Sequence, residues 1–134
     1  MSSVRFTSLT GGMIGLAQED LRRKVDIAFL AAFYGGMLTE NQRTILSLHC
    51  EEDLSMGEIA EEVGISRQAV HETLTRASAK LTEMEEILGA AGRFRKMEAG
   101  LAEALDALKR TDYTQAEQIL ENLLTLERED NNGL

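Results

Sequence analysis

Hydrophobic residues recur every three or four positions along most of the chain, which is the spacing of one face of an α-helix. Runs with this spacing predict helices over residues 20–34, 56–62, 66–88, 93–110 and 114–128, and a short helix after Thr39. No run alternates apolar and polar residues in the manner of a half-buried strand. The pattern therefore predicts an all-α protein.

The most regular apolar stripe lies within residues 66–88. It advances in steps of three and four residues through Val70, Leu74, Ala77, Leu81, Met84 and Leu88. A stripe of this kind predicts one buried side for a long helix. The helix expected over residues 20–34 has a looser pattern, in which the apolar residues near one face are Leu21, Val25, Ala28, Phe29, Ala32 and Phe33.

Capping residues mark three of the expected helix starts. Thr39 and Gln42 have the spacing of a capping box, and Ser55 and Glu58 repeat it. In this device the first side chain accepts a backbone N–H, and the second reaches back to the start of the helix. Ser66 stands where it can cap the long helix. These positions define where the central helices should begin.

Residues 55–76 have the spacing of a helix-turn-helix. Ala60 falls where the two helices cross closely, Gly64 follows in the turn, and Val70 lies where the second helix packs back on the first. Glycine suits the turn because it adopts a positive φ without steric cost. The remaining core positions expected for the motif are Ile59, Val63, Ile65 and Leu74.

The second helix of the motif carries the candidate nucleic-acid-binding residues, because a helix-turn-helix places its early turns in the major groove. They are Ser66, Arg67, Gln68, His71, Glu72, Thr75 and Arg76. Gln68 can pair with adenine, and Arg67 or Arg76 with guanine or a phosphate. The helix N-terminus at Ser66 favours a phosphate. The same residues also fit the solvated face of a helix that contacts other proteins, and the sequence leaves both interpretations open.

The charge of the chain argues against tight duplex binding. The net charge is −9, and residues 37–88 hold four basic and eleven acidic side chains, a net charge of −7. Duplex affinity comes largely from Lys and Arg side chains that neutralise phosphates. We therefore expect weak DNA binding that is lost sharply as the salt concentration rises.

The sequence predicts neither an enzyme nor a metal or cofactor site. His49 and Cys50 are adjacent, so on a helix their side chains point about 100° apart, a poor geometry for a nucleophile and its base. We expect Cys50 to be buried and His49 to lie at the surface. His71 has no second ligand near it in the sequence. The glycine pairs lack the residues that accompany them in nucleotide-binding loops.

Location and processing follow from what the chain lacks. The longest apolar run, residues 27–38, spans 12 residues and is too short to cross a bilayer. The mixed, partly acidic residues before it differ from a signal peptide. The single Cys50 cannot form an internal disulfide. We therefore expect a cytoplasmic protein.

Composition divides the chain into four segments. Residues 1–19 predict a flexible lead, 20–88 the helix-turn-helix domain, 89–129 a C-terminal helical hairpin, and 130–134 a polar tail. Two helices cannot bury wide apolar faces by themselves. The hairpin should therefore pack on the long helix or on a second subunit, and we predict a homodimer formed largely by residues 80–128.

From residue 26 to residue 86 the sequence resembles the bacterial YlxM family of helix-turn-helix proteins. The motifs that carry the resemblance are Phe33-Tyr34, Leu38-Thr39-Glu40-x-Gln42, Leu54-Ser55-x-Gly57-Glu58-Ile59-Ala60 and Ser66-Arg67-Gln68-Ala69-Val70. The implied fold is similar to the promoter-reading C-terminal domain of sigma factors. Thr39 stands where sigma factors usually have proline, which favours the YlxM family over a true sigma factor.

The resemblance also implies a function without naming catalytic residues. Members of the family tend to be encoded beside the genes for the signal recognition particle protein and its receptor. The implied role is a small regulator of that pathway or of its genes, acting on DNA. The alternative is an accessory factor that binds the particle's protein, its RNA or its receptor without binding DNA.

Overall fold

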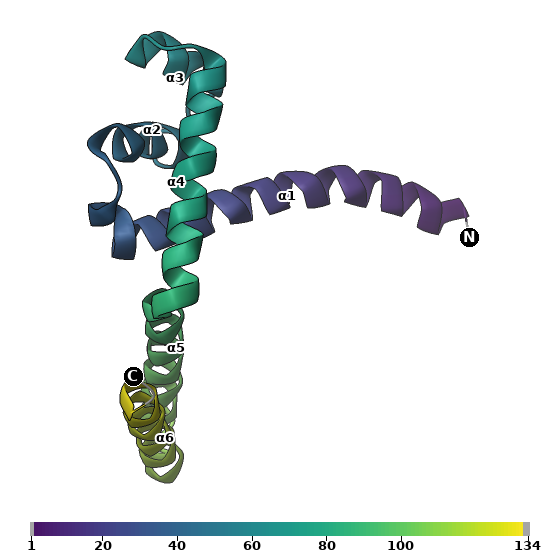
Figure 1. Ribbon diagram of the computed structural model, residues 1–134. Helices are drawn as coiled ribbons and strands as arrows, with labels where there is room; N and C mark the ends of the chain where they lie inside the picture. The colour runs from purple at the N-terminus through teal and green to yellow at the C-terminus, as the bar shows by residue number, and fades with distance from the viewer. Residues whose placement is uncertain (1, 133–134) are drawn as a thin grey trace. The chain divides into compact units, whose positions relative to one another are not determined.

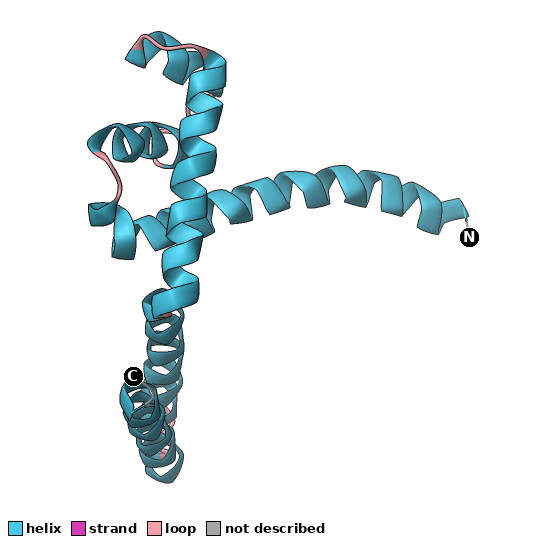
Figure 2. Ribbon diagram, in the orientation of Figure 1, coloured by secondary structure: helices cyan, strands magenta, loops and turns pink. Residues whose placement is uncertain are grey.

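The structure is a computed structural model that describes the backbone of residues 2–132 and the side chains of residues 18–129. Within residues 2–132 the chain forms helices joined by short turns, with no strand (Figure 2). The elements are α1 (Ser2–Tyr34), the 3-10 helix η1 (Gly35–Met37), α2 (Glu40–Cys50), α3 (Met56–Val63), α4 (Arg67–Leu88), α5 (Ala90–Lys109) and α6 (Tyr113–Asn132). The predicted all-α class is confirmed.

The chain divides into two compact units, residues 1–88 and residues 89–134. The first contains α1 to α4 and is called the helix-turn-helix unit below. The second contains α5 and α6 and is called the hairpin unit. None of the helices in the described part of the chain is long and apolar enough to span a membrane.

Helix α4 is the centre of the helix-turn-helix unit, because α1, α2 and α3 all pack against it (Figure 1). The fully enclosed side chains are Ile45 of α2, Ile59 of α3, and Val70, Ala77 and Leu81 of α4. The predicted stripe on α4 is therefore buried as far as Leu81. Beyond that point it opens to solvent, and Leu88 is 45% exposed.

The predicted capping boxes are present at the starts of α2 and α3. The Gln42 N–H donates to Thr39 Oγ1 at 3.1 Å, and Gln42 Oε1 accepts from the Thr39 N–H at 3.0 Å. The same pair of bonds joins Ser55 and Glu58, at 3.1 and 3.2 Å. Each box satisfies donors that the first turn of a helix leaves without partners.

Helix α1 differs from the sequence-based expectation at both ends. Its backbone is helical from Ser2, whereas a flexible lead was expected over residues 1–19. The chain has no proline to stop a helix, and the glycines of this stretch lower helix propensity by about 1 kcal/mol each without breaking the helix. Further along, Leu21 and Val25 are 63% and 57% exposed, whereas Tyr34 is buried.

The inward side of α1 is set by its partners instead. Tyr34 is 4% exposed, and its hydroxyl donates to Glu85 Oε1 of α4 at 2.5 Å. Ile27, Leu30 and Ala31 are half-buried and lie on the same side of the helix as Tyr34. Ala28 and Phe29 of the predicted face are half-buried as well, so the difference is that Tyr34 is buried whereas Leu21 and Val25 stay exposed.

The hairpin unit is held together by small residues. Ala104 and Ala107 of α5 and Ala116 of α6 are buried between the helices. A Cβ atom added to Gly100 would lie 2.4 Å from Leu123 Cδ2, so the Leu123 side chain of α6 packs directly on the α5 backbone at this point. The polar tail predicted over residues 130–134 is partly helical, because α6 continues to Asn132, and residues 133–134 lie outside the described part of the chain.

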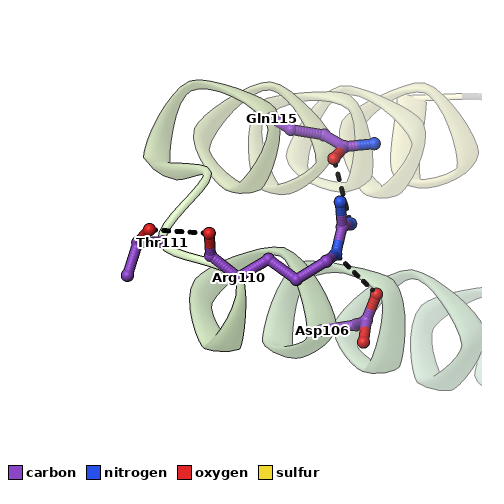
Figure 3. Close-up of polar contacts among 4 residues, drawn as sticks. All are labelled: Asp106, Arg110, Thr111 and Gln115. Carbon is purple, nitrogen blue, oxygen red and sulfur yellow. Dashed lines mark hydrogen bonds and ion pairs between the residues drawn. The ribbon is translucent and has the colours of Figure 1, made fainter.

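The turn between α5 and α6 is fastened by side chains of one face. Arg110 donates to Asp106 Oδ2 and to Gln115 Oε1, each at 3.1 Å, and so links both helices across the turn (Figure 3). Asp112 Oδ1 accepts from the Gln115 N–H at 3.1 Å and caps α6. Thr111 adopts a left-handed φ of 57° as the chain reverses. The hairpin therefore has one polar, internally bonded side.

Candidate nucleic-acid interface

The turn between α3 and α4 has the local structure that the sequence predicted. Gly64 ends α3 at a left-handed φ of 79°, and its N–H donates to the Ala60 carbonyl at 2.9 Å. Two residues later, Ser66 Oγ accepts from the Ala69 N–H at 3.0 Å and caps α4. Because α3 and α4 also pack on each other, the pair forms a helix-turn-helix.

All seven candidate residues on α4 and its cap are exposed, and those from Gln68 to Arg76 follow one another around the outer side of α4. By helical spacing, Gln68, Glu72 and Arg76 lie on the side of α4 opposite the buried stripe or on one flank of that side. Thr75 points in nearly the same direction as Gln68, seven residues before it, and His71 lies beside them, where these two residues and Ser78 line a groove. Base contacts from the outward side would thus come mainly from Gln68.

Arg67 is engaged within the motif. A Cβ atom added to Gly57 would lie 2.7 Å from Arg67 Nη2 and 3.0 Å from its Cζ, so the guanidinium lies directly on the first turn of α3. Gly57 leaves the room for this contact. The Arg67 side chain therefore lies between the start of α4 and the start of α3 while it stays exposed, and its contact with a base or a phosphate stays a prediction.

Sequence reasoning missed the role of Gly57. Glycine in a helix costs about 1 kcal/mol relative to alanine, so a glycine within a short predicted helix is a signal that its space is used. Its occupant, Arg67, is ten positions away, and periodicity alone does not pair the two.

A groove of about 800 Å³ runs between α1 and α4 over residues of α2 and α3. Apolar side chains form much of its lining, among them Ile27, Leu30, Met56 and Leu74. Charged residues of α1 stand along it: Asp20, Arg23, Lys24 and Asp26. Both histidines of the chain, His49 and His71, also line it.

His49 is half-buried in this groove and not at the surface as predicted. Its Nδ1 atom is buried and has no hydrogen-bond partner among the described residues. Loss of hydration and the nearby charge of Lys24 lower the pKa of His49 below its ordinary 6.5, although a backbone hydrogen bond at Leu54 and the charge of Asp53 oppose this. The folded protein therefore favours the neutral imidazole.

Lys24 connects α1 to the loop between α2 and α3. Its Nζ lies 2.6 Å from Asp53 Oδ1, and Asp53 has a left-handed φ of 54°. The hydrogen bond and the charge of Lys24 hold the pKa of Asp53 below its ordinary value. This ion pair is exposed on the aspartate side and serves mainly to place the loop that precedes α3.

The pKa of His49 makes the stability of the helix-turn-helix unit depend on pH. Because the folded state binds the proton less readily than the unfolded state, stability is present above pH 6.5 and is lost as the pH falls toward the lowered pKa. We expect the melting temperature to fall between pH 7 and pH 5, and His49→Gln to reduce that dependence. Circular dichroism melts measure this, with the exposed His71→Gln as control. A His49→Gln slope equal to that of wild type would contradict the assignment.

The chemistry of the site offers no support for catalysis. Burial raises the pKa of the Cys50 thiol, which disfavours the nucleophilic thiolate. Among the residues whose side chains are described, no three His, Cys, Asp or Glu side chains gather in a way that could hold a metal ion.

The fold and the capped α3–α4 pair define a small helix-turn-helix protein. Over residues 21–127 the chain matches the family model UPF0122, described as "Putative helix-turn-helix protein, YlxM / p13 like". The chain therefore belongs to the UPF0122 family, and the resemblance to the YlxM proteins is confirmed.

Relatives from several bacteria support the assignment over most of their lengths. A UPF0122 protein of Desulforamulus reducens is 42% identical over 95 residues, which cover 71% of this chain and 81% of the relative. A UPF0122 protein of Halalkalibacterium halodurans is 39% identical over 108 residues, or 80% of this chain and 99% of the relative. One from Symbiobacterium thermophilum is 41% identical over 102 residues, or 76% and 92%.

Proposed function

We propose that the protein is a non-catalytic, cytoplasmic regulator that binds duplex DNA through α4. The observation that carries the proposal is that α4 is packed on one side and exposed on the other. Its inner side is packed against three helices, whereas Gln68, Glu72 and Arg76 at its start are exposed. A helix held in this way can enter a major groove as a rigid element.

Charge determines what kind of DNA binding this can be. Glu58, Glu61 and Glu62 are exposed on α3, next to α4 in the motif, and oppose a phosphate backbone. Arg76 and Lys80 are the cations on the outer part of α4. With so few cations, non-specific affinity is weak, and discrimination depends on direct contacts with base edges.

In this proposal Gln68 and Arg76 have different roles. Gln68 lies at the start of α4 and can make the paired hydrogen bonds that recognise adenine. Arg76 lies two turns further along and reaches a phosphate. Arg67 acts as a positioning residue, because its guanidinium lies on α3 at Gly57.

We expect Gln68→Ala to weaken binding to a preferred duplex by roughly 5- to 150-fold, the loss of one base-reading pair, with little change for random duplexes. Arg76→Gln should weaken binding to every duplex and reduce the slope of log affinity against log salt by about 1. Both are measured by fluorescence anisotropy, after selection of preferred sequences from a random duplex library at low salt.

The matched control is Arg43→Gln, which removes one exposed positive charge from α2 rather than from the helix-turn-helix pair. It should leave the preference among duplexes unchanged. Failure to enrich any duplex at low salt would overturn the proposal, as would equal effects of Gln68→Ala and Arg43→Gln on the preferred site.

The link to the signal recognition particle that the resemblance implies stays a prediction, as does the alternative of an accessory factor that does not bind DNA. Capture of the particle's protein or receptor from a nuclease-treated lysate, or of its RNA from an untreated one, without DNA enrichment, would favour that alternative. In that case Gln68→Ala should leave the capture of these partners unchanged.

A further inference from the structure

The hairpin unit has an apolar face that its own helices leave exposed. On α5 the exposed apolar residues directly follow the positions that pack on α6, and on α6 the exposed apolar residues lie on the corresponding side. They are Leu101, Leu105 and Leu108 on α5, and Tyr113, Leu120 and Leu124 on α6. Their exposed fractions run from 39% to 66%. These six residues are called the apolar face below.

The antiparallel arrangement of the hairpin brings the two halves of this face together. Leu101, Leu105 and Leu108 are each one residue past Gly100, Ala104 and Ala107, which face α6. A one-residue step turns by about 100° in the same sense on both helices. The two helices run in opposite directions and face each other. The residue that follows a facing position therefore points to the same side of the hairpin on both helices. The six side chains therefore form one surface.

The opposite side of the hairpin is polar and already bonded. It carries Glu103 together with the Asp106–Arg110–Gln115 contacts that span the turn (Figure 3). The two sides of one small unit thus differ sharply in chemistry. An amphipathic helical pair of this kind is half of a helical bundle, and it lacks the layer that would cover its apolar side.

Two acid–base pairs among the charged residues that border the apolar face are self-complementary, and Glu121 is a further acid on the α6 edge. On the α5 edge an acid, Glu98, precedes a base, Lys109, by eleven residues, and on the α6 edge Glu117 precedes Arg128 by the same interval. Eleven residues are about three helical turns, so both members of each pair lie on one side of their helix. When a second hairpin is laid on the face by a two-fold axis, facing helices are antiparallel. Each acid then meets a base, whether α5 packs on α5 or on α6.

We propose that a second copy of this chain covers the apolar face, forming a two-fold, four-helix interface from α5 and α6 of both copies. Each helix has 20 residues and is about 30 Å long, and two helices about 9 Å apart present roughly 600 Å². Two copies would bury about 1,200 Å² in total, which is the lower end of the range for stable interfaces. The proposal names the surface for the homodimer predicted from residues 80–128.

This interface also deepens the proposed function, since a two-fold pair of helix-turn-helix units suits a palindromic site. It does not depend on DNA binding for its own support. The oligomeric state is measured without DNA, so failure of the dimer and failure of DNA recognition give different results.

The test is light scattering coupled to size exclusion on the full chain at several concentrations. Wild type should approach twice the 14.8 kDa of one chain as concentration rises. Leu124→Glu should shift the equilibrium to monomer. Leu126→Glu is the matched control, because Leu126 is also exposed (46%) on α6 but lies toward the polar side, and it should remain dimeric. Circular dichroism establishes that both variants keep their helices.

Reversing the charges of the two pairs tests the interface independently. Glu98→Lys with Glu117→Lys makes all four residues of the two pairs positive and should weaken dimerisation at low salt, and adding Lys109→Glu with Arg128→Glu should restore it. A wild type that stays monomeric at every concentration overturns the proposal. So do equal effects of Leu124→Glu and Leu126→Glu on the mass, or a fourfold reversal that fails to restore the dimer.

Discussion

Replacing Ile59 with alanine should lower the free energy of unfolding of the helix-turn-helix unit by about 2–5 kcal/mol, the usual cost of removing a large side chain from a packed core. Ile59 has no exposed surface and lies on α3, a helix of only eight residues. So short a helix depends on packing for its stability. Urea denaturation followed by circular dichroism measures the change as a shift in the midpoint.

Ile87→Ala is the matched control for this prediction. Ile87 lies on α4 of the same unit and is 73% exposed, so the same change of residue removes little buried surface. Its free energy of unfolding should stay within about 0.5 kcal/mol of wild type, as for most surface substitutions. Equal losses for the two variants would show that Ile59 is not part of a packed core.

The second large effect is expected in the hairpin unit. Overpacking by Gly100→Leu should cost α5–α6 about 3 kcal/mol, the upper end of the usual range, so the net destabilisation should be about 2 kcal/mol. The first added carbon alone would lie 2.4 Å from Leu123 Cδ2 and 2.9 Å from its Cγ, so Leu123 must leave its packed position or the helices must separate. The better helix propensity of leucine returns only about 1 kcal/mol. Thermal melts of the full chain, with hydrogen exchange of the α5 and α6 amides, assign the loss to this unit.

Ala99→Leu places the same side chain one residue earlier, at an exposed position of α5, and should leave the melt almost unchanged. A further arm tests the contact itself. In a Leu123→Ala background the space beside Gly100 is open, so Gly100→Leu should cost much less than it does in wild type. An unchanged cost would place the strain somewhere other than the contact with Leu123.

The elements around the helix-turn-helix were predictable because their signals are local. Capping boxes at Thr39 and Ser55 depend on residues three positions apart, and the turn at Gly64 depends on one residue's freedom to adopt a positive φ. The stripe through Leu81 follows from helical periodicity. Each of these is complete within a few residues of sequence.

The surroundings of the predicted site residues could not be read from the sequence, for the opposite reason. All seven residues are exposed, as a surface site requires, but Arg67 lies on α3 and His71 and Thr75 turn toward the groove. Whether a long side chain extends into solvent or lies on a neighbouring helix depends on the space beside it. Here Gly57 supplies that space, and only the packing of α3 on α4 brings the two residues together.

Taken alone, the amino-acid sequence determined the helical class, the starts of α2, α3 and α4, the turn between α3 and α4, and the family. The tertiary structure decided which face of α1 is buried, that His49 lies in a groove, and that one side of the α5–α6 hairpin is apolar and exposed. The division has a physical cause. Backbone hydrogen bonds and caps join residues close in the chain, whereas burial is settled by helices that meet from distant parts of it.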